Sequence, residues 1–255
     1  MTAPLICVHN MTMAFGYNVV QRDLTFDVLP GEVLAIAGGS GCGKSTLLRH
    51  LIGLQAPAAG QVLHGSQDLY AADARTLDVL RQGFGVAFQA GALWSSMTVG
   101  ENVMLPMQLF TSLDAQACEQ AARFKLALVG LSGSFEAEPA QLSGGMRKRA
   151  AIARALALDP PLLFLDEPSA GLDPLSSAQL DELIGHLRDD LGTAVVMVSH
   201  ELGSIFALAD RVLFLDAQTK TMTALGPPDE LLHHGPPGVQ AFLRRGAKQP
   251  EAQTA

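Results

Sequence analysis

Cysteine is scarce in this 255-residue chain: only Cys7, Cys42 and Cys118 are present, and they lie far apart. Three scattered cysteines build neither a disulfide framework nor a zinc site, so we expect folding in a reducing compartment such as the cytosol. Positive charge is also scarce, because 17 Lys and Arg stand against 25 Asp and Glu, for a net charge of −8. Proteins that bind nucleic acid usually carry a basic face, so we expect no nucleic-acid partner.

Long apolar runs are absent as well. No uninterrupted run reaches the roughly 18 to 20 residues of a membrane span, and the N-terminus lacks the cationic start and apolar core of a signal peptide. We therefore expect that the chain does not cross a membrane by itself. One stretch is short of charge: residues 82–113 contain a single charged side chain, Glu101. With 48% hydrophobic residues and no internal repeat, the chain can bury the core of one large unit.

A glycine-rich loop follows the apolar strand predicted at 33–37 and precedes a segment with helical apolar spacing. It reads GGSGCGKST and fits the pattern G-x-x-x-x-G-K-[ST]. Glycines let the backbone close around phosphate oxygens, and the helix that follows offers free N–H groups to the same anion. We expect Lys44 to meet the β- and γ-phosphates and Ser45 to bind Mg²⁺. The candidate phosphate-binding residues are Gly38, Gly39, Ser40, Gly41, Cys42, Gly43, Lys44, Ser45 and Thr46. Cys42 is interpreted as a small filler of the loop and not as a redox sensor.

Three further strands are expected to end in polar residues at the same edge of a sheet, where α/β proteins bind ligands. The apolar run 162–165 leads to Asp166, a second Mg²⁺ ligand, and to Glu167, a candidate general base for the attacking water. Gln89 follows the strand predicted at 85–88 and can reach the metal or that water. His200 follows a β-branched strand at 193–198, and we favour a contact with the γ-phosphate over a structural role.

A second anion site is predicted at Ser143, Gly144 and Gly145, which precede a helical run at 147–158. Serine is a favoured helix N-cap, and the two glycines leave backbone N–H groups open to an anion. Upstream of the first site, Phe15 either packs in the core or stacks on a base, and Tyr17 is the competing aromatic. A helix is expected over 114–130, with Ala117, Ala121, Phe124 and Leu128 on its apolar face.

The order of these motifs resembles that of the nucleotide-binding subunit of an ABC transporter, over nearly the whole chain. Residues 38–45 match Walker A, Gln89 the Q-loop, LSGGM the signature, LLFLDE Walker B, and His200 the H-loop. Met146 is the one departure, since the family usually has glutamine there. The resemblance implies an α/β P-loop NTPase (RecA-like) core with an antiparallel β subdomain and an inserted α-helical subdomain. It also implies ATP and Mg²⁺ as cofactors, and a homodimer in which each ATP lies between Walker A of one chain and the signature of the other.

The resemblance gives boundaries and narrower expectations. The nucleotide-binding domain is placed at 5–243, the helical subdomain at about 95–158, and a disordered tail at 244–255. Residues 89–99, 202–211 and 238–244 look like those of ATPases that work with mammalian-cell-entry (MCE) proteins. Such systems move phospholipids or other lipids between the inner and outer membranes. The implied partners are an integral membrane permease and an MCE-type protein, with the ATPase peripheral at the cytoplasmic face of the inner membrane. The alternatives are the ATPase of a polar-solute importer and a soluble ABC ATPase of repair or translation.

The charge-poor stretch then has a candidate use. In ABC ATPases the segment after the Q-loop forms the groove that receives a helix of the membrane subunit, and Trp94, Leu105 and Phe110 suit such a contact. Burial in the subdomain core accounts for part of the stretch in either case.

Overall fold

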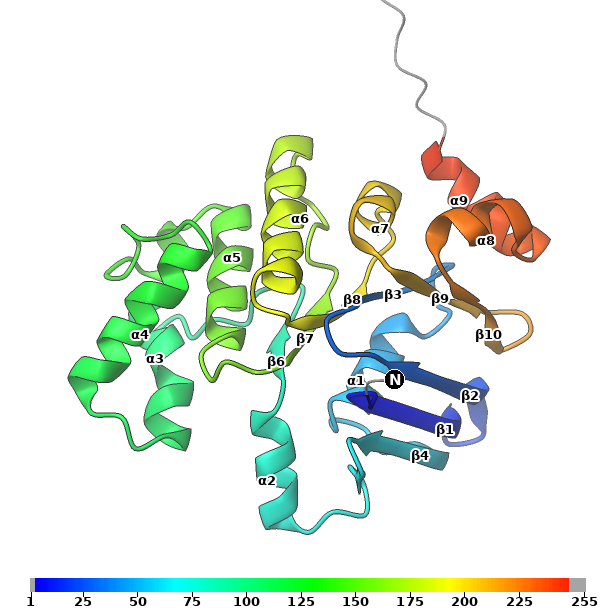
Figure 1. Cartoon of the computed structure of the whole chain (residues 1–255), viewed down its shortest axis with the longest axis horizontal. Coiled ribbons are helices and arrows are strands. Elements are labelled where there is room, and N and C mark those ends of the chain that lie inside the picture. Colours follow the sequence, from blue (N-terminus) through cyan, green and yellow to red (C-terminus); the bar gives the residue numbers. More distant parts are fainter. Residues whose placement is uncertain (1–2, 248–255) are drawn as a thin grey trace, which may run out of the picture.

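The computed structural model describes residues 3–247 and places them in two β-sheets with helices around them (Figure 1). The larger sheet has the strand order β10-β9-β3-β8-β7-β6. Its strands from β9 to β6 are parallel, and β10 pairs antiparallel with β9. The strands are β3 (Val33–Gly38), β6 (Gly85–Ala87), β7 (Leu162–Asp166), β8 (Ala194–Val198), β9 (Arg211–Asp216) and β10 (Thr221–Gly226). Strands β9 and β10 form the hairpin near the C-terminus.

Both faces of this sheet are covered, which explains why its central strands are continuous apolar runs. Along β3 the side chains alternate between two cores: Val33, Ala35 and Ala37 pack on one face, and Leu34 and Ile36 on the other. The first core is shared with α5 (Gly144–Ala155), α6 (Pro174–Asp189) and α7 (Leu202–Leu208). Helices α6 and α7 lie above the sheet in Figure 1. The second is shared with α1 (Lys44–Leu51).

The smaller sheet is antiparallel, with the order β2-β1-β4-β5, and confirms the expected β subdomain. Its strands are β1 (Ile6–Phe15), β2 (Asn18–Val28), β4 (Ala59–His64) and β5 (Gln67–Asp68). Helix α1 lies between the two sheets, and its Leu47, Leu48 and Leu51 are fully buried with residues of both. The short helix α2 (Ala74–Gln82) follows this sheet and leads back to β6.

A group of helices inserted between β6 and β7 lies to one side of the sheets, as the expected helical subdomain does (Figure 1). It contains α3 (Val99–Phe110), α4 (Ala115–Leu128), a 3₁₀ turn (Pro139–Gln141) and α5. The face predicted for α4 is wrong. The helix buries Cys118, Ala122, Lys125 and Leu126, whereas Phe124 is 58% exposed. In an alanine-rich helix, a rotation of one residue exchanges alanines for alanines, so hydropathy alone does not select the face.

The chain ends in α8 (Pro228–His234) and α9 (Pro237–Ala247). Since α9 continues to Ala247, the tail boundary predicted at 244 lies inside a helix, and residues 248–255 lie outside the described residues. Val239 and Leu243 on α9 are buried against the first core, which is why the helix extends this far. Among residues 3–247, no helix has the length and apolarity that crossing a membrane requires.

Candidate nucleotide-binding site

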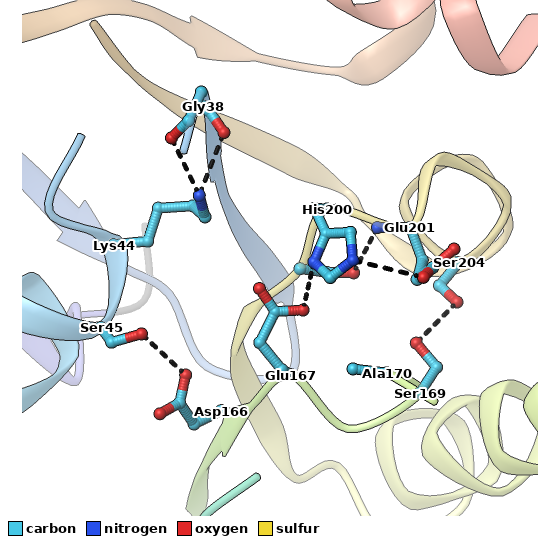
Figure 2. Close-up of polar contacts among 12 residues, drawn as sticks. Gly38, Lys44, Ser45, Asp166, Glu167, Ser169, Ala170, His200, Glu201 and Ser204 are labelled. Atoms are coloured by element: carbon cyan, nitrogen blue, oxygen red, sulfur yellow. Dashed lines mark hydrogen bonds and ion pairs between the residues drawn. The ribbon is translucent and has the colours of Figure 1, made fainter. Parts of the chain in front are cut away.

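The glycine-rich loop joins β3 to α1 in a backbone conformation that is unfavourable for residues with a Cβ atom. Gly38, Gly41 and Gly43 have φ angles of 144°, 74° and 100°. A Cβ on Gly38 would lie 2.3 Å from the carbonyl oxygen of Leu215, so glycine is required there by the fold itself. Helix α1 begins at Lys44, whose Nζ donates to the carbonyl oxygens of Gly38 and Gly39 at 3.0 and 3.1 Å (Figure 2). The loop therefore presents backbone N–H groups, a helix N-terminus and an ammonium group together, as a phosphate requires.

Cys42 and Gln21, a residue of the smaller sheet, fix the position of the glycine-rich loop. The side chain of Cys42 is 1% exposed, and its burial raises the pKa of the thiol. Gln21, on β2, is fully buried and donates from Nε2 to the carbonyl oxygens of Cys42 (2.8 Å) and Asp216 (2.9 Å). Cys42 can thus meet a ligand only through its backbone, in agreement with its interpretation as a filler. Sequence reasoning missed Gln21, because no local pattern marks a contact between residues 21 and 216.

Ser45 and Asp166 come together from α1 and the end of β7. The hydroxyl of Ser45 donates to Oδ1 of Asp166 at 3.2 Å. Burial raises the pKa of Asp166, and the hydrogen bond from Ser45 acts in the opposite direction. A half-buried carboxylate with a raised pKa gains from a nearby cation, so this oxygen pair fits Mg²⁺, which takes one or two protein oxygens and completes its shell with phosphate and water. No group of three His, Cys, Asp or Glu suited to a metal occurs among the described residues, so the pair would depend on oxygens from the nucleotide.

Glu167 and His200 face each other from the ends of β7 and β8 (Figure 2). Nδ1 of His200 lies 2.7 Å from Oε2 of Glu167, and Nε2 lies 3.4 Å from Oε1 of Glu201. Oε2 of Glu167 is buried and has no aligned hydrogen-bond donor within residues 3–247. Glu167 also lines the cavity beside the phosphate loop, so its carboxylate is placed to accept a proton from water there.

These elements enclose a cavity of about 680 Å³, which is a usual size for a small-molecule site. It is lined by Phe15, Asn18, Val20, Gly38, Ser40, Gly41, Gly43, Lys44, Ser45, Thr46, Glu167 and His200. Phe15 lines the cavity and is 52% exposed, whereas Tyr17 is fully exposed in the adjacent turn and does not line the cavity. The geometry thus favours Phe15 over Tyr17 for stacking on a base. Asn18 and Val20 were missed, since only the pairing of β1 with β2 brings them to the loop.

Gln89 lies apart from the cavity lining. It is exposed in the turn after β6, the strand that pairs with β7. Gln89 follows the strand next to β7, but it does not line the cavity in this structure. Contact of Gln89 with metal or water stays a prediction.

The second anion site is likewise separate from the first. Ser143 is the N-cap of α5 and accepts from the backbone N–H of Met146 at 3.2 Å, with Gly144 opening the helix. Ser143 and Gly144 are exposed, and neither they nor Gly145 line the cavity. The chain therefore carries two helix ends predicted to bind phosphate, and it does not bring them together itself.

A buried polar chain near the site also escaped sequence reasoning. Ser204, on α7, donates to Oδ2 of Asp181 on α6 at 2.8 Å, and its hydroxyl lies 3.4 Å from that of Ser169 (Figure 2). Ser169 follows Glu167 in the loop after β7 and is 3% exposed. The two hydroxyls thus connect the loop that carries Glu167 to the helix that follows His200.

The parallel sheet, glycine-rich loop and strand-end carboxylates define a P-loop nucleoside triphosphatase. The family model described as ABC transporter matches residues 21–170, and the chain belongs to this family, as an ATP-hydrolysing subunit.

Curated relatives agree over most of the chain. It is 36% identical over 241 residues to the intermembrane phospholipid transport system ATP-binding protein MlaF of Escherichia coli K12, covering 94% of this chain and 89% of that protein. It is 37% identical to the probable ribonucleotide transport ATP-binding protein mkl of Mycobacterium tuberculosis H37Rv over 92% of this chain, and spans 65% of the length of that relative.

Solved structures show the same fold. The chain superposes on CbiO1 of Clostridium perfringens, described as part of the ABC transporter complex CbiONQ, with a TM-score of 0.82 and 25% identity, covering 91% of this chain and 92% of that one. It superposes on the ATP-binding cassette MJ0796, described as a dimeric post-hydrolysis state bound to ADP and Pi, with a TM-score of 0.79 and 27% identity, covering 87% and 98%.

Proposed function

We propose that this subunit dimerises on ATP and drives a membrane permease that moves phospholipid, together with an MCE-type protein, between the inner and outer membranes. The observation that supports the lipid is the 36% identity to MlaF over nearly the full length of both chains. The subunit would then lie at the cytoplasmic face of the inner membrane as a peripheral protein. The mkl relative carries a name that refers to ribonucleotides, so a polar-solute importer is the alternative.

The site residues take distinct roles in this proposal. ATP with Mg²⁺ supplies the phosphoanhydride bond that is hydrolysed. Lys44 binds the β- and γ-phosphates as a point charge, and Ser45 and Asp166 hold the metal. Glu167 orients the attacking water and accepts its proton. His200, which lies beside the carboxylate of Glu167, contacts the γ-phosphate. Gln89 approaches from the end of β6, and Phe15 packs on the adenine.

Dimerisation explains the second helix end. Ser143, Gly144 and Gly145 are open to solvent and separate from the cavity of their own chain. In a head-to-tail pair they would offer their N–H groups to the γ-phosphate bound by the partner subunit. The dimeric state described for MJ0796, bound to ADP and Pi, supports this arrangement.

The charge-poor stretch supports a membrane partner. Phe110 at the end of α3 and Val79 on α2 are 52% and 64% exposed, and Leu113 is 48% exposed. These three side chains line a hollow of about 460 Å³. Phe110 also lines a second hollow, of about 200 Å³, beside Pro106. The two hollows are lined mainly by apolar side chains, with Asp159 in the first and Arg81 and Arg154 in the second. A mainly apolar groove fits a partner's apolar helix, and Trp94, which is 59% exposed, lies on the charge-poor stretch.

Charge placed on the charge-poor stretch tests the partner. We expect that at least one of Trp94→Glu, Leu105→Glu and Phe110→Glu stays folded and binds ATP, yet fails to co-purify with the membrane subunit, because an unpaired charge in an interface is costly. Leu105 is only half-exposed, so its variant is the one most at risk of unfolding. Leu191→Glu is the control, since Leu191 is 51% exposed at the far end of α6. If all three of these variants still co-purify with the membrane subunit, the partner docks elsewhere.

The lipid is tested with the co-purified complex in liposomes. ATP-dependent movement of a labelled phospholipid to acceptor vesicles, abolished by Glu167→Gln, is the expected result. Stimulation of the ATPase by a polar solute without lipid movement would favour the importer. Failure to recover any membrane subunit from detergent extracts would favour a non-transport ABC ATPase.

A further inference from the structure

We propose that Lys148 is a positioning residue that ties the signature helix α5 to the loop carrying the general base, so that the two composite sites of the dimer respond to each other. The inference rests on the proposed head-to-tail dimer. Lys148 lies on α5, five residues after Ser143 and little more than one helical turn from the exposed helix end. The mechanism above gives this side chain no role.

The contacts of Lys148 are with backbone and not with another side chain. Its Nζ donates to the carbonyl oxygen of Ala170 at 2.5 Å and to that of Glu167 at 3.1 Å. Both carbonyls belong to the loop after β7, which is drawn beside His200 in Figure 2. The ammonium group therefore bridges two points of one loop from a different helix, and charge-assisted bonds of this kind are about twice as strong as neutral ones.

The environment of the ammonium group shows that the contact is built into the fold. Lys148 is half-buried, and this burial lowers its pKa, while the charges of Glu167 and Glu201 act in the opposite direction. An amine that loses hydration is retained where carbonyl oxygens and carboxylates replace the water. The two glutamates are the same ones that flank His200.

The backbone of Glu167 needs such support. Its φ angle is 51°, in the left-handed region that a side chain other than glycine's disfavours. The N–H of Glu167 donates to the carbonyl oxygen of Val198 at 2.9 Å, which anchors one side of the peptide. The carbonyl on the other side accepts from Lys148 and from the N–H of Ala170 at 3.3 Å. Lys148 thus favours the backbone conformation that aims the carboxylate at the phosphate loop.

The consequence concerns both nucleotides of the dimer. Glu167 serves the ATP bound by its own chain, whereas Ser143 serves the ATP bound by the partner. Because Lys148 joins the helix of one to the loop of the other, a shift of the loop during hydrolysis moves the signature helix, and docking of the signature fixes the general base. A single side chain thereby acts on both sites.

Hydrolysis by the Lys148→Met variant is the first measurement, because methionine keeps an apolar stem and removes the charge. We expect kcat to fall about 10- to 100-fold, while KM and the affinity of the monomer for a fluorescent ATP analogue stay within twofold. Lys148→Arg should restore most of kcat, since the guanidinium can donate to both carbonyls. Arg149→Gln, a charge removal at the next residue of α5 whose guanidinium lies beside Gly130, is the control and should keep its kcat.

ATP-driven dimerisation is the second measurement, made in the Glu167→Gln background so that hydrolysis does not intervene. Lys148→Met should raise the concentration needed for dimer formation about tenfold, as seen by sedimentation or light scattering. Slower hydrolysis with unchanged dimerisation would overturn the inference, because Lys148 would then act on the general base alone. A matching loss of ATP affinity in the monomer, or equal loss in Arg149→Gln, would overturn it as well.

Two controls separate the possible failures. If Glu167→Gln alone does not dimerise on ATP, the proposed dimer is wrong and the inference falls with it. If Lys148→Met melts well below the parent protein, Lys148→Gln, which can still donate one hydrogen bond, replaces it in both measurements. Normal hydrolysis and dimerisation by that variant would overturn the role of the charge.

Discussion

The two glycine-rich turns of this molecule have opposite structural reasons for their glycines. In the phosphate loop, a Cβ on Gly38 would meet the Leu215 carbonyl oxygen at 2.3 Å and Cys42 Sγ at 2.7 Å, so the fold of the chain excludes side chains. In the signature turn, a Cβ on Gly144 would have no neighbour within 4 Å among residues 3–247. The fold of this chain tolerates a side chain there. The need for glycine at Gly144 therefore comes from whatever approaches the turn from outside.

The polar contacts differ in the same way. The phosphate loop is held by Gln21 from β2 and by the Lys44 ammonium, and both are contacts within the chain. The signature turn is held by bonds of its own segment: the Met146 N–H donates to the Ser143 hydroxyl, and the Arg147 guanidinium donates to the Leu142 carbonyl oxygen. The phosphate loop is thus fixed by contacts with distant parts of the chain, whereas the signature turn is an exposed helix end. This difference is what a composite site shared between two subunits requires.

The largest effect is expected at the open helix end. Ser143→Arg should abolish ATPase activity while the isolated monomer keeps its ATP affinity, because a bulky cation blocks the partner's phosphate and leaves the chain's own cavity intact. ATPase assays and equilibrium binding of a fluorescent ATP analogue measure the two quantities. Loss of ATP binding by the monomer would place Ser143 in the site of its own chain.

A mixed dimer gives the control for Ser143→Arg. Lys44→Ala weakens nucleotide binding, since a charge-assisted contact with phosphate is lost. One Ser143→Arg subunit paired with one Lys44→Ala subunit retains a single composite site made of intact parts. That composite site should still bind and trap an ATP analogue. If neither site of the mixed dimer traps the analogue, the head-to-tail geometry is contradicted.

A large effect on rate alone is expected at Glu167. Glu167→Gln should keep ATP binding and lose about 10²- to 10⁴-fold in turnover, as removal of a positioned general base does. Single-turnover hydrolysis with radiolabelled ATP measures the chemical step. Near-normal hydrolysis by the purified variant would remove Glu167 from the role, and Glu201→Gln, the other carboxylate beside His200, is the control.

A smaller effect separates the two turns directly. Gly38→Ala should lower the free energy of unfolding by about 1–3 kcal/mol or more, since a side chain there is strained and meets backbone. Gly144→Ala should leave that free energy within about 0.5 kcal/mol, yet still reduce ATPase activity. Urea unfolding of the two variants decides the matter. Equal destabilisation would mean that the signature turn is also fixed by this chain.

The sequence predicts the parts of this molecule that depend on local patterns. Continuous apolar runs mark β3, β7 and β8, because a strand buried on both faces has no polar side to show. The phosphate loop is predicted because its chemistry sits in nine consecutive residues. What escaped prediction depends on distant contacts: Gln21 meets the carbonyl of Asp216, 195 residues away. The face of α4 was wrong because a buried Lys125 contacts Asp159, which no helical periodicity reveals.

The smallest effect concerns the loop after β7, which carries Glu167 and Ser169, and whether contacts within the chain fix its conformation. Burial raises the pKa of Asp181, which accepts the hydrogen bond from Ser204. A carboxyl group with a raised pKa in the folded state binds its proton more tightly there than when unfolded, so it lowers stability at neutral pH, and this cost disappears as pH falls through the folded-state pKa. Asp181→Asn keeps an oxygen for Ser204 and removes the charge.

We therefore expect Asp181→Asn to unfold with a free energy equal to or up to about 1 kcal/mol above that of the parent at pH 7, with the difference shrinking toward pH 4. Asp189→Asn, on the same helix, is the control of opposite sign. The hydrogen bond from Arg188 lowers the pKa of Asp189, so its removal should reduce stability across this whole pH range, because a carboxyl group with a lowered pKa loses its stabilising effect only below its unfolded-state pKa. Urea unfolding between pH 4 and 7 measures both variants. If Asp181→Asn is the less stable at pH 7 and also loses ATPase activity, the ionised carboxylate holds the loop of Glu167 through Ser204 and Ser169, and that loop depends on its own chain as firmly as the phosphate loop does.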